Sequence, residues 1–490
     1  MANRFWFGSV HLDVSAGADR TPGVPSDDAP FRILVLGDFS GRSARKIREP
    51  LSGRKPMLID RDNYDEVLAR VKPELWLSAG QGDPFALRLR FSELDDFHPD
   101  RIFETLDLFQ ALRQTRERLS DPGTFKQTAT DLQSWTASPP RTEPAPRPEE
   151  LISGGSLLDQ MIEDSGAATA PARRPADELQ AFIQRIVAPH LTPRPDPKQA
   201  ELVSEVDSSI AAQMSAILHH HAFQSLEAAW RGVFMLVRGL DTNSLLKLYI
   251  LDVSKEELAA DLLPSDRLDR TQVYRLLVEQ GLPGADPWAL SAGLYTFDGS
   301  ERDAQLLGRM APIARAAGAP FVAEAGEGLL GDESAALELW RTLRGLPEAQ
   351  WIGLAMPRFL LRLPYGEDSS PTEEFRYEEM DEGAGHAAYL WGNPALICAR
   401  LLGQSFSDSG WQFTPDRHRE VSGLPLHVYK EQGESQVKPC AEVLMTESMA
   451  EAMLERGVMP LASLKEQDAV RLVRFQSIAE PPAHLAGRWG

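Results

Sequence analysis

The chain has 490 residues, of which 42% are hydrophobic and 25% charged, so it is long enough for several globular domains. Its formal net charge of −21 argues against nucleic acid and anionic membranes as partners, because both repel an acidic surface. It has neither a signal-peptide pattern nor a long uninterrupted apolar run, which predicts a soluble cytoplasmic protein. Cys398 and Cys440 lie in apolar or mixed contexts that favour buried thiols, although the sequence leaves one disulfide open.

The first 125 residues predict a small α+β unit. Val10, Leu12 and Val14 alternate with polar residues and predict a strand near the N-terminus. Further strands are expected at 31–36 and 86–91, and helices at 62–71 and 99–119. The last of these helices carries an apolar stripe, so we expect it to dock this unit on the rest of the chain.

A proline-rich linker follows the first unit. Residues 139–148 hold five prolines among ten residues, which removes amide donors and favours extended backbone. We therefore expect an extended, mobile connection over 126–150. Over 151–200, short helices are expected at 151–163 and 176–187, with polar stretches between them.

From residue 201 onward, strands and helices alternate, which predicts a layered α/β domain. The most informative stretch is 206–237, where apolar residues at helical spacing predict two amphipathic helices with a break at 219–221. Expected strands are 245–251, 292–297, 319–323 and 351–356, and expected helices are 254–261, 304–317 and 334–343.

Three consecutive histidines, His219, His220 and His221, suggest a metal site. Consecutive residues on a helix point about 100° apart, so they do not converge on one ion, and a helix junction is favoured. Residues 37–42, GDFSGR, lack the GK[ST] ending of a phosphate loop and predict a tight turn. We recognise no metal, cofactor or catalytic motif.

Large and charged side chains in apolar surroundings are candidates for contacts. Arg358 and Arg362 either clamp an anion or pair with carboxylates at 373–374 or 378–379, across a fold or a subunit contact. The side chains of Trp230, Trp391 and Trp411 are core or interface anchors.

Several motifs occur in one colinear series, at 206–237 (with ILHH and FQSLEAAWRG), 356–366, 389–395 and 457–461. Together they resemble the large subunit of the contractile sheath of type VI secretion systems (the TssC or VipB kind). Motifs at 35–41, 59–67 and 94–97 resemble the small subunit instead (the TssB or VipA kind).

The resemblance implies a fused, non-enzymatic sheath protein. Its fold is expected to be a sheath-type layered α/β domain with mixed sheets, plus a small N-terminal α+β domain and a proline-rich linker. The expected divisions are 1–125 (small-subunit-like), 126–150 (linker), 151–200 (large-subunit N-terminal helices) and 201–490 (large-subunit-like). The implied partners are other sheath subunits, with the hexameric ATPase that recycles sheath and the inner tube protein as further candidates.

Family large subunits continue beyond the region that matches 477–478, so the usual C-terminal acceptor strands are not expected here. For that reason we expect the protein alone to be a monomer or small oligomer, and an accessory or end-capping role is the first alternative. A second alternative is an α/β enzyme, which a cleft with convergent polar groups at the carboxyl ends of the strands would favour.

The candidate interface residues come from the N-terminal strand, the 151–163 helix and the strongest motifs. They are Val10, Leu12, Val14, Leu157, Leu158, Ile162, Trp230, Arg231, Arg358, Arg362 and Trp391.

Overall fold

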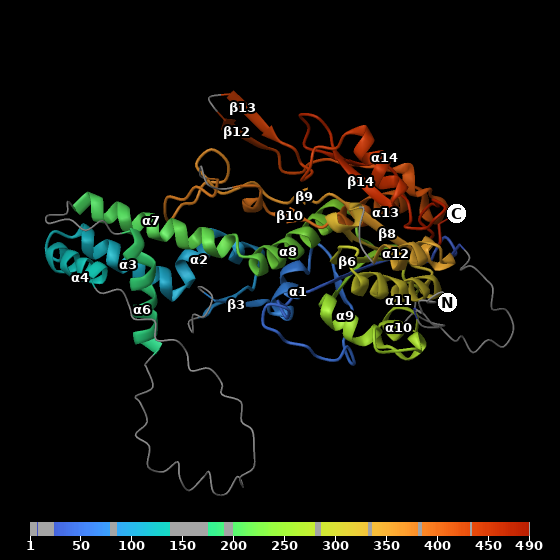
Figure 1. Cartoon of the computed structure of the whole chain (residues 1–490), viewed down its shortest axis with the longest axis horizontal. Coiled ribbons are helices and arrows are strands. Elements are labelled where there is room, and N and C mark those ends of the chain that lie inside the picture. Colours follow the sequence, from blue (N-terminus) through green and yellow to red (C-terminus); the bar gives the residue numbers. More distant parts are fainter. Residues whose placement is uncertain are drawn as a thin grey trace, which may run out of the picture.

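The computed structural model describes residue 7 and residues 24–78, 86–137, 175–190, 199–279, 286–331, 336–380, 385–431 and 434–489. These residues form an elongated molecule, with an α/β body at one end and an arm of helices at the other (Figure 1). The α/β class predicted from the sequence is confirmed. No helix in these ranges is both long and apolar enough to span a membrane.

A nine-stranded mixed sheet forms the centre of the body. Its strands are β1 (Phe31–Gly37), β2 (Met57–Ile59), β5 (Leu246–Asp252), β6 (Leu290–Phe297), β7 (Phe321–Ala325), β8 (Ile352–Met356), β11 (Glu420–Val421), β14 (Val458–Ser463) and β15 (Val470–Leu472). They are arranged in the order β11-β15-β14-β8-β7-β6-β1-β5-β2. The strands from β14 to β5 in this order are parallel, whereas β2, β15 and β11 are antiparallel to their neighbours.

Strand β1 explains why its sequence is an almost continuous apolar run. Phe31, Ile33 and Val35 belong to the core on one face of the sheet, and Leu34 and Leu36 belong to the core on the other face. Side chains alternate between the two faces of a strand, so a parallel strand covered on both faces is apolar at nearly every position, and Arg32 is the exception here.

Helices cover both faces of the sheet. Helices α1 (Tyr64–Val71), α8 (His221–Gly239) and α13 (Ala395–Ser409) contribute to the first core. Helices α9 (Lys255–Leu262), α10 (Gln272–Leu277), α11 (Glu301–Ala317), α12 (Ala336–Arg344) and α14 (Glu447–Glu455) contribute to the second. The expected strands and helices of this region lie within about three residues of the observed ones.

The arm consists of α2 (Pro99–Thr105), α3 (Asp107–Ser120), α4 (Phe125–Ala137), α6 (Pro175–Val187) and α7 (Gln199–Leu218) (Figure 1). The single helix expected over 99–119 is broken at Leu106, whose backbone is extended with φ −79° and ψ 127°. The apolar stripe is nevertheless buried as expected, because α3 packs on α7.

The expected linker begins too early. Residues 126–137 were expected to be extended, but they form helix α4, in which Ala129 and Leu132 are buried. The prolines that disfavour helix begin only at position 139, and the residues before them tolerate helical backbone. The rest of the expected linker, 138–150, lies outside the described residues.

The small N-terminal α+β unit expected over 1–125 shares the central sheet with the rest of the chain. Its strand β1 pairs with β5 on one side and with β6 on the other, so it lies inside the sheet of the second segment. The sequence did not indicate this pairing, because an apolar run identifies a buried strand without identifying its neighbours.

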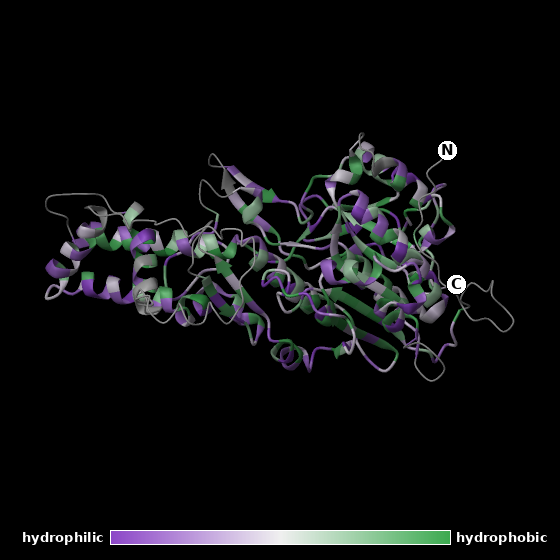
Figure 2. Ribbon diagram, turned by 60° about the horizontal axis from the view of Figure 1, so that its bottom comes forward, coloured by the Kyte–Doolittle hydropathy of each residue, from purple (hydrophilic) through white to green (hydrophobic). Residues whose placement is uncertain are grey.

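Three two-stranded sheets complete the fold. They are β3 (Glu74–Ser78) with β4 (Ala86–Arg90), β9 (Phe359–Leu360) with β10 (Trp391–Gly392), and β12 (His427–Glu431) with β13 (Glu434–Lys438). The last of these is a hairpin that projects from the body (Figure 1). Hydrophobic residues concentrate in the central sheet, and hydrophilic residues are frequent on the outer helices (Figure 2).

Candidate functional site

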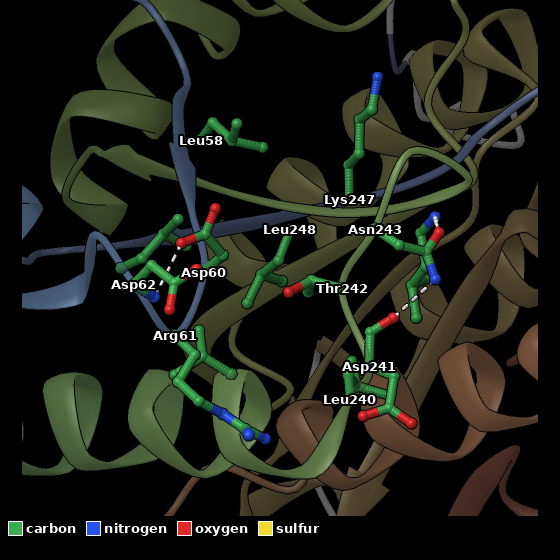
Figure 3. Close-up of a pocket in the computed structure, with 13 residues that line it drawn as sticks. Leu58, Asp60, Arg61, Asp62, Leu240, Asp241, Thr242, Asn243, Lys247 and Leu248 are labelled. Carbon is green, nitrogen blue, oxygen red and sulfur yellow. Dashed lines mark hydrogen bonds between the residues drawn. The ribbon is translucent and has the colours of Figure 1, made fainter.

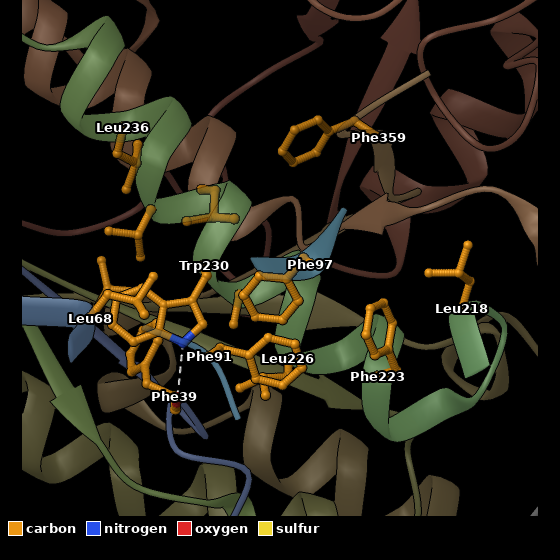
Figure 4. Packing of buried hydrophobic residues seen from close by; sticks show 14 of the residues in the cluster. Phe39, Leu68, Phe91, Phe97, Leu218, Phe223, Leu226, Trp230, Leu236 and Phe359 are labelled. Carbon is orange, nitrogen blue, oxygen red and sulfur yellow. Dashed lines mark hydrogen bonds between the residues drawn. The ribbon is translucent and has the colours of Figure 1, made fainter. Parts of the chain in front are cut away.

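Trp230 of α8 connects the first segment to the second (Figure 4). Its side chain is fully buried, and its indole Nε1 donates a hydrogen bond to the carbonyl of Phe39 at 2.8 Å. The hydroxyl of Tyr64 donates to the carbonyl of Trp230, also at 2.8 Å. The rings of Phe39 and Tyr64 lie edge-on to the indole, with centroid distances of 5.3 and 5.9 Å. We call Phe39, Tyr64 and Trp230 the tryptophan joint; its polar groups are satisfied inside an apolar core.

Charged side chains also join the two segments to each other, near the ends of β1 and β5. Asp252 accepts hydrogen bonds from Ser40 Oγ at 2.8 Å and from Arg42 Nε at 2.9 Å. Arg54 binds Glu257, with 2.6 Å between Nη2 and Oε1. Burial alone would raise the pKa of Glu257, but the hydrogen bonds from Arg54 and from backbone amides lower it. Residues 37–42 thus form a structural turn, as the sequence predicted.

Four charged residues form a second, more deeply buried group, which we call the ionic network. Arg362 donates two hydrogen bonds to Glu379, at 2.7 and 2.9 Å, and one to Glu227 at 3.0 Å. Arg231 also binds Glu227, with 2.7 Å between Nε and Oε1. The network therefore joins α8 to the segments around Arg362 and Glu379, with two positive and two negative charges.

Opposite charges pair throughout the network, although Glu227 Oε2 is buried without a hydrogen-bond partner among the described residues. Burial on its own would raise the pKa of Glu379, but the charge of Arg362, together with hydrogen bonds from Arg362 and from the amide of Tyr365, lowers it to about 2. Glu379 and Glu227 have fully buried side chains. Since a buried charge without a partner is costly, each member depends on the others.

The two arginines singled out from the sequence have different outcomes. Arg362 binds Glu379, so the pairing expected with 378–379 is confirmed. Arg358 does not pair with 373–374 or 378–379; its Nε binds Glu442 Oε2 at 2.8 Å. The backbone explains the difference, because the amide of Glu442 donates to the carbonyl of Arg358 and holds the two residues side by side.

Most candidate interface residues that the structure describes lie inside the chain. Trp230, Arg362 and Trp391 are buried, and the side chain of Arg231 is 21% exposed. The indole of Trp391 stacks on His386 at 5.0 Å between centroids. These side chains therefore contact elements of their own chain. Trp411 is likewise a core residue.

Six candidate interface residues are not placed by the structure. They are Val10, Leu12, Val14, Leu157, Leu158 and Ile162, which all lie outside the described residues.

The three histidines have separate roles, as expected for a helix junction. His219 lies 3.4 Å from Glu379, between Nε2 and Oε1. The ring of His220 caps α8 by accepting a hydrogen bond from the amide of Ala222. His221 lines a cavity. Both cysteines, Cys398 and Cys440, are buried free thiols.

Two cavities lie at the joined segments. One, of about 370 Å³, lies beside β2 and the end of α8; its aspartates Asp60 and Asp241 take part in hydrogen bonds of local turns (Figure 3). The other, of about 520 Å³, lies at the carboxyl ends of the parallel strands. We call it the switch-point cavity. Polar groups converge there, at the edge of the sheet where α/β enzymes bind their ligands.

Sequence reasoning missed several residues that hold the segments together. Glu227 had a usable signal, because it lies four residues before Arg231 on one helix and such pairs face each other. Glu442 and Asp252 had none, since their partners are 84 and 210 residues away in sequence.

Comparisons with known proteins match the two segments separately. Residues 200–479 match the VipB family, described as EvpB/VC_A0108, tail sheath N-terminal domain. Residues 23–133 match a family described as type VI secretion system, VipA, VC_A0107 or Hcp2.

Two curated relatives from Pseudomonas aeruginosa show the same division. The chain is 34% identical over 304 residues to the type VI secretion system sheath protein TssC1, which covers 57% of this chain and 61% of the relative. It is 29% identical over 101 residues to the sheath protein TssB1, which covers 20% of this chain and 58% of the relative. The chain thus spans about three fifths of the length of each relative.

Proposed function

Since this chain belongs to the VipB tail-sheath family of type VI secretion systems, we propose that it is a structural subunit of a contractile sheath. It carries a TssB-like and a TssC-like segment in one polypeptide. The observation that carries the proposal is the position of β1, which comes from the TssB-like segment and lies between β5 and β6 of the TssC-like segment.

The contacts between the two segments support a permanent unit. The tryptophan joint is buried and apolar, and the pairs Arg42–Asp252 and Arg54–Glu257 lie beside it. Interfaces of this kind are typical of obligate complexes. A covalent connection also raises the effective concentration of one segment for the other to roughly the millimolar range. The fused chain therefore supplies both segments in equal amounts.

We propose further that its partners are other sheath subunits and that it acts in the cytoplasm. The test uses a tagged full-length chain, expressed with and without TssB-type and TssC-type subunits and examined by sedimentation and electron microscopy. With those subunits, the tagged chain sediments with the sheath polymers and is visible along them or at their ends. The amount of tagged chain that sediments in the absence of these subunits is the background against which the mixture is compared.

The outcomes separate the alternatives. Regular tubes formed by the chain alone exclude an accessory role, and labelling confined to the ends of mixed sheaths favours an end-capping role. Absence of the chain from every polymer, alone and in the mixture, contradicts a sheath function.

We also propose that the segment around Leu157, Leu158 and Ile162 is recognised by the hexameric ATPase that recycles sheath. The support is the resemblance of this segment to the recognised helix of the family, whose apolar edge enters a groove. Replacing Leu157 and Leu158 together with Ala weakens ATPase binding at least about tenfold, which corresponds to about 1.4 kcal/mol. Asp159→Ala, a change in the same segment that keeps the apolar edge, serves as the control. Equal affinity of both variants would remove the proposal.

A further inference from the structure

The strand order of the sheet creates a crevice. Five parallel strands follow the order β8-β7-β6-β1-β5, so the chain adds β5 on one side of β1 and then β6 on the other. Helix α8, which precedes β5, packs on one face, whereas α9 and α10, which precede β6, pack on the opposite face. The segments at the carboxyl ends of β1 and β6 therefore diverge, and ligands of α/β sheets bind at such a point.

The switch-point cavity lies at this crevice and has a volume of about 520 Å³. Its lining includes five charged residues and a group of apolar side chains. The charged residues are Asp38, Lys255, Glu256, Glu324 and Arg358, and the apolar ones include Leu226 and Trp391.

The two cations of this set are already neutralised by carboxylates from outside the lining. Lys255 Nζ lies 2.6 Å from Asp303 Oδ1 and also donates to the carbonyl of Thr296 at 2.6 Å. Arg358 donates to Glu442, with 2.8 Å between Nε and Oε2. Neither cation is therefore free to attract an anion into the cavity.

The carboxyls of Asp38 and Glu324 have no such compensation. Asp38 accepts hydrogen bonds from the backbone amides of Arg42 and Ser43, both at 2.7 Å, and Glu324 accepts one from Thr296 Oγ1 at 3.0 Å. Within the described part of the chain, no Lys, Arg or His nitrogen lies within 4.0 Å of either carboxyl. Burial raises the pKa of both, and that of Glu324 reaches about 7 despite the nearby charge of Arg358.

We propose that the switch-point cavity binds a guanidinium or ammonium group on an aliphatic stem, with Glu324 and Asp38 as its counter-charges. The carboxylates of Glu324 and Asp38 attract the cationic group, and the apolar side chains of Leu226 and Trp391 cover the methylene stem. An anionic ligand would meet the three carboxyls of Asp38, Glu256 and Glu324, and the two cations of the described lining are already paired. A lysine or arginine side chain of another protein and a free small amine share this chemistry.

Binding depends on the ionisation of Glu324. The charges that act on it are those of Arg358 and Glu442, and the other charged or titratable residues that line the cavity are Asp38, Lys255, Glu256 and His221. A cation binds the carboxylate form, so affinity for the probe rises as the pH increases through about 7.

The test is calorimetric titration of the full-length protein with agmatine, which carries a guanidinium group on a four-carbon stem, and with the peptide acetyl-Gly-Arg-Gly-amide. Agmatine binds about tenfold more tightly at pH 8 than at pH 6. With a pKa near 7, Glu324 is about nine-tenths ionised at pH 8 and mostly protonated at pH 6. Glu324→Gln weakens binding at least tenfold at pH 8 and removes most of this pH dependence. Binding of the peptide as well indicates a protein side chain as the source, whereas binding of agmatine alone indicates a free amine.

Two controls keep the test decisive. Glu327→Gln changes an exposed carboxyl three residues away and leaves affinity unchanged, and His221→Asn shows that the pH dependence does not come from the imidazole. The folded-state pKa of Glu324 lies above the ordinary value of 4.5, so ionisation of this side chain lowers the stability of the folded protein as the pH rises from 4.5 to 7. The neutral side chain of Glu324→Gln avoids this loss, and the variant therefore remains folded. Absence of agmatine binding at pH 8, tighter binding of inorganic phosphate, or equal affinity of the Glu324→Gln variant and the unaltered protein overturns the proposal.

Discussion

Replacing Arg362 with Ala lowers the free energy of unfolding by about 3–5 kcal/mol, the range typical of breaking a buried ion pair from one side. The variant leaves Glu379 and Glu227 in the interior with their main counter-charge removed. Arg231 still neutralises part of Glu227, so most of the loss arises at Glu379.

Urea unfolding followed by tryptophan fluorescence measures this loss. The control is Arg376→Ala, which removes an exposed arginine 14 residues away and changes stability by less than about 0.5 kcal/mol. Adding Glu379→Gln to Arg362→Ala recovers part of the loss, because no unpaired carboxylate then remains at that position. An Arg362→Ala protein as stable as the Arg376→Ala control would contradict a stabilising network.

The effect of Arg362→Ala also depends on pH, in a direction that the pKa of Glu379 fixes. The folded-state pKa of about 2 lies below the ordinary value of 4.5, so pairing stabilises the protein fully above pH 4.5. That contribution disappears as the pH falls from 4.5 toward 2. The difference between the variant and the unaltered protein is therefore largest near neutral pH and decreases in acid.

Replacing Trp230 with Ala has a comparable effect on the tryptophan joint. Truncating a buried aromatic residue costs about 3–5 kcal/mol, because its contacts are lost and a cavity remains. The change also leaves the carbonyl of Phe39 without its hydrogen bond from the indole. Trp76→Ala is the matched control, since Trp76 is 52% exposed and its loss costs little.

A cleavable version of the chain shows whether this cost falls on the contact between the segments. With a protease site inserted between residues 138 and 174, the cleaved halves of the unaltered protein elute together, because β1 pairs on both sides within the sheet. In Trp230→Ala the cleaved halves separate at a lower urea concentration than in Trp76→Ala. If the cleaved halves of both variants separate at the same urea concentration, the tryptophan joint does not hold the segments together.

Local patterns predicted the elements of this fold better than their arrangement. The apolar runs that became β1, β5, β6, β7 and β8 were identifiable because parallel strands buried on both faces have few polar positions. Strands β2 and β15 have three residues each, too few for a period to be visible. The place of β1 between β5 and β6 depends on pairing across the whole chain, which no local pattern encodes.

The candidate site shows the same limit. The pair Arg362–Glu379 was predictable, because the arginine lies in an apolar run and an acidic stretch follows it within 17 residues. The pair Arg358–Glu442 was not, since it requires the bridge between Phe359 and Ala441 that brings the two segments together. The Trp230 side chain was identified as an anchor, but its partner Phe39 could be found only from the structure.

The position of β1 also has a consequence for synthesis on the ribosome. Phe31 pairs with Leu246, so the strand emerges more than 200 residues before its first partner. At about 5–20 residues per second, this interval lasts roughly 10–40 s, during which an apolar seven-residue segment has no strand to pair with. Such segments aggregate when exposed, and charged neighbours oppose this. Asp27 and Asp28 before the strand and Asp38 directly after it are such neighbours, and they accompany the nascent strand until β5 and β6 have been translated.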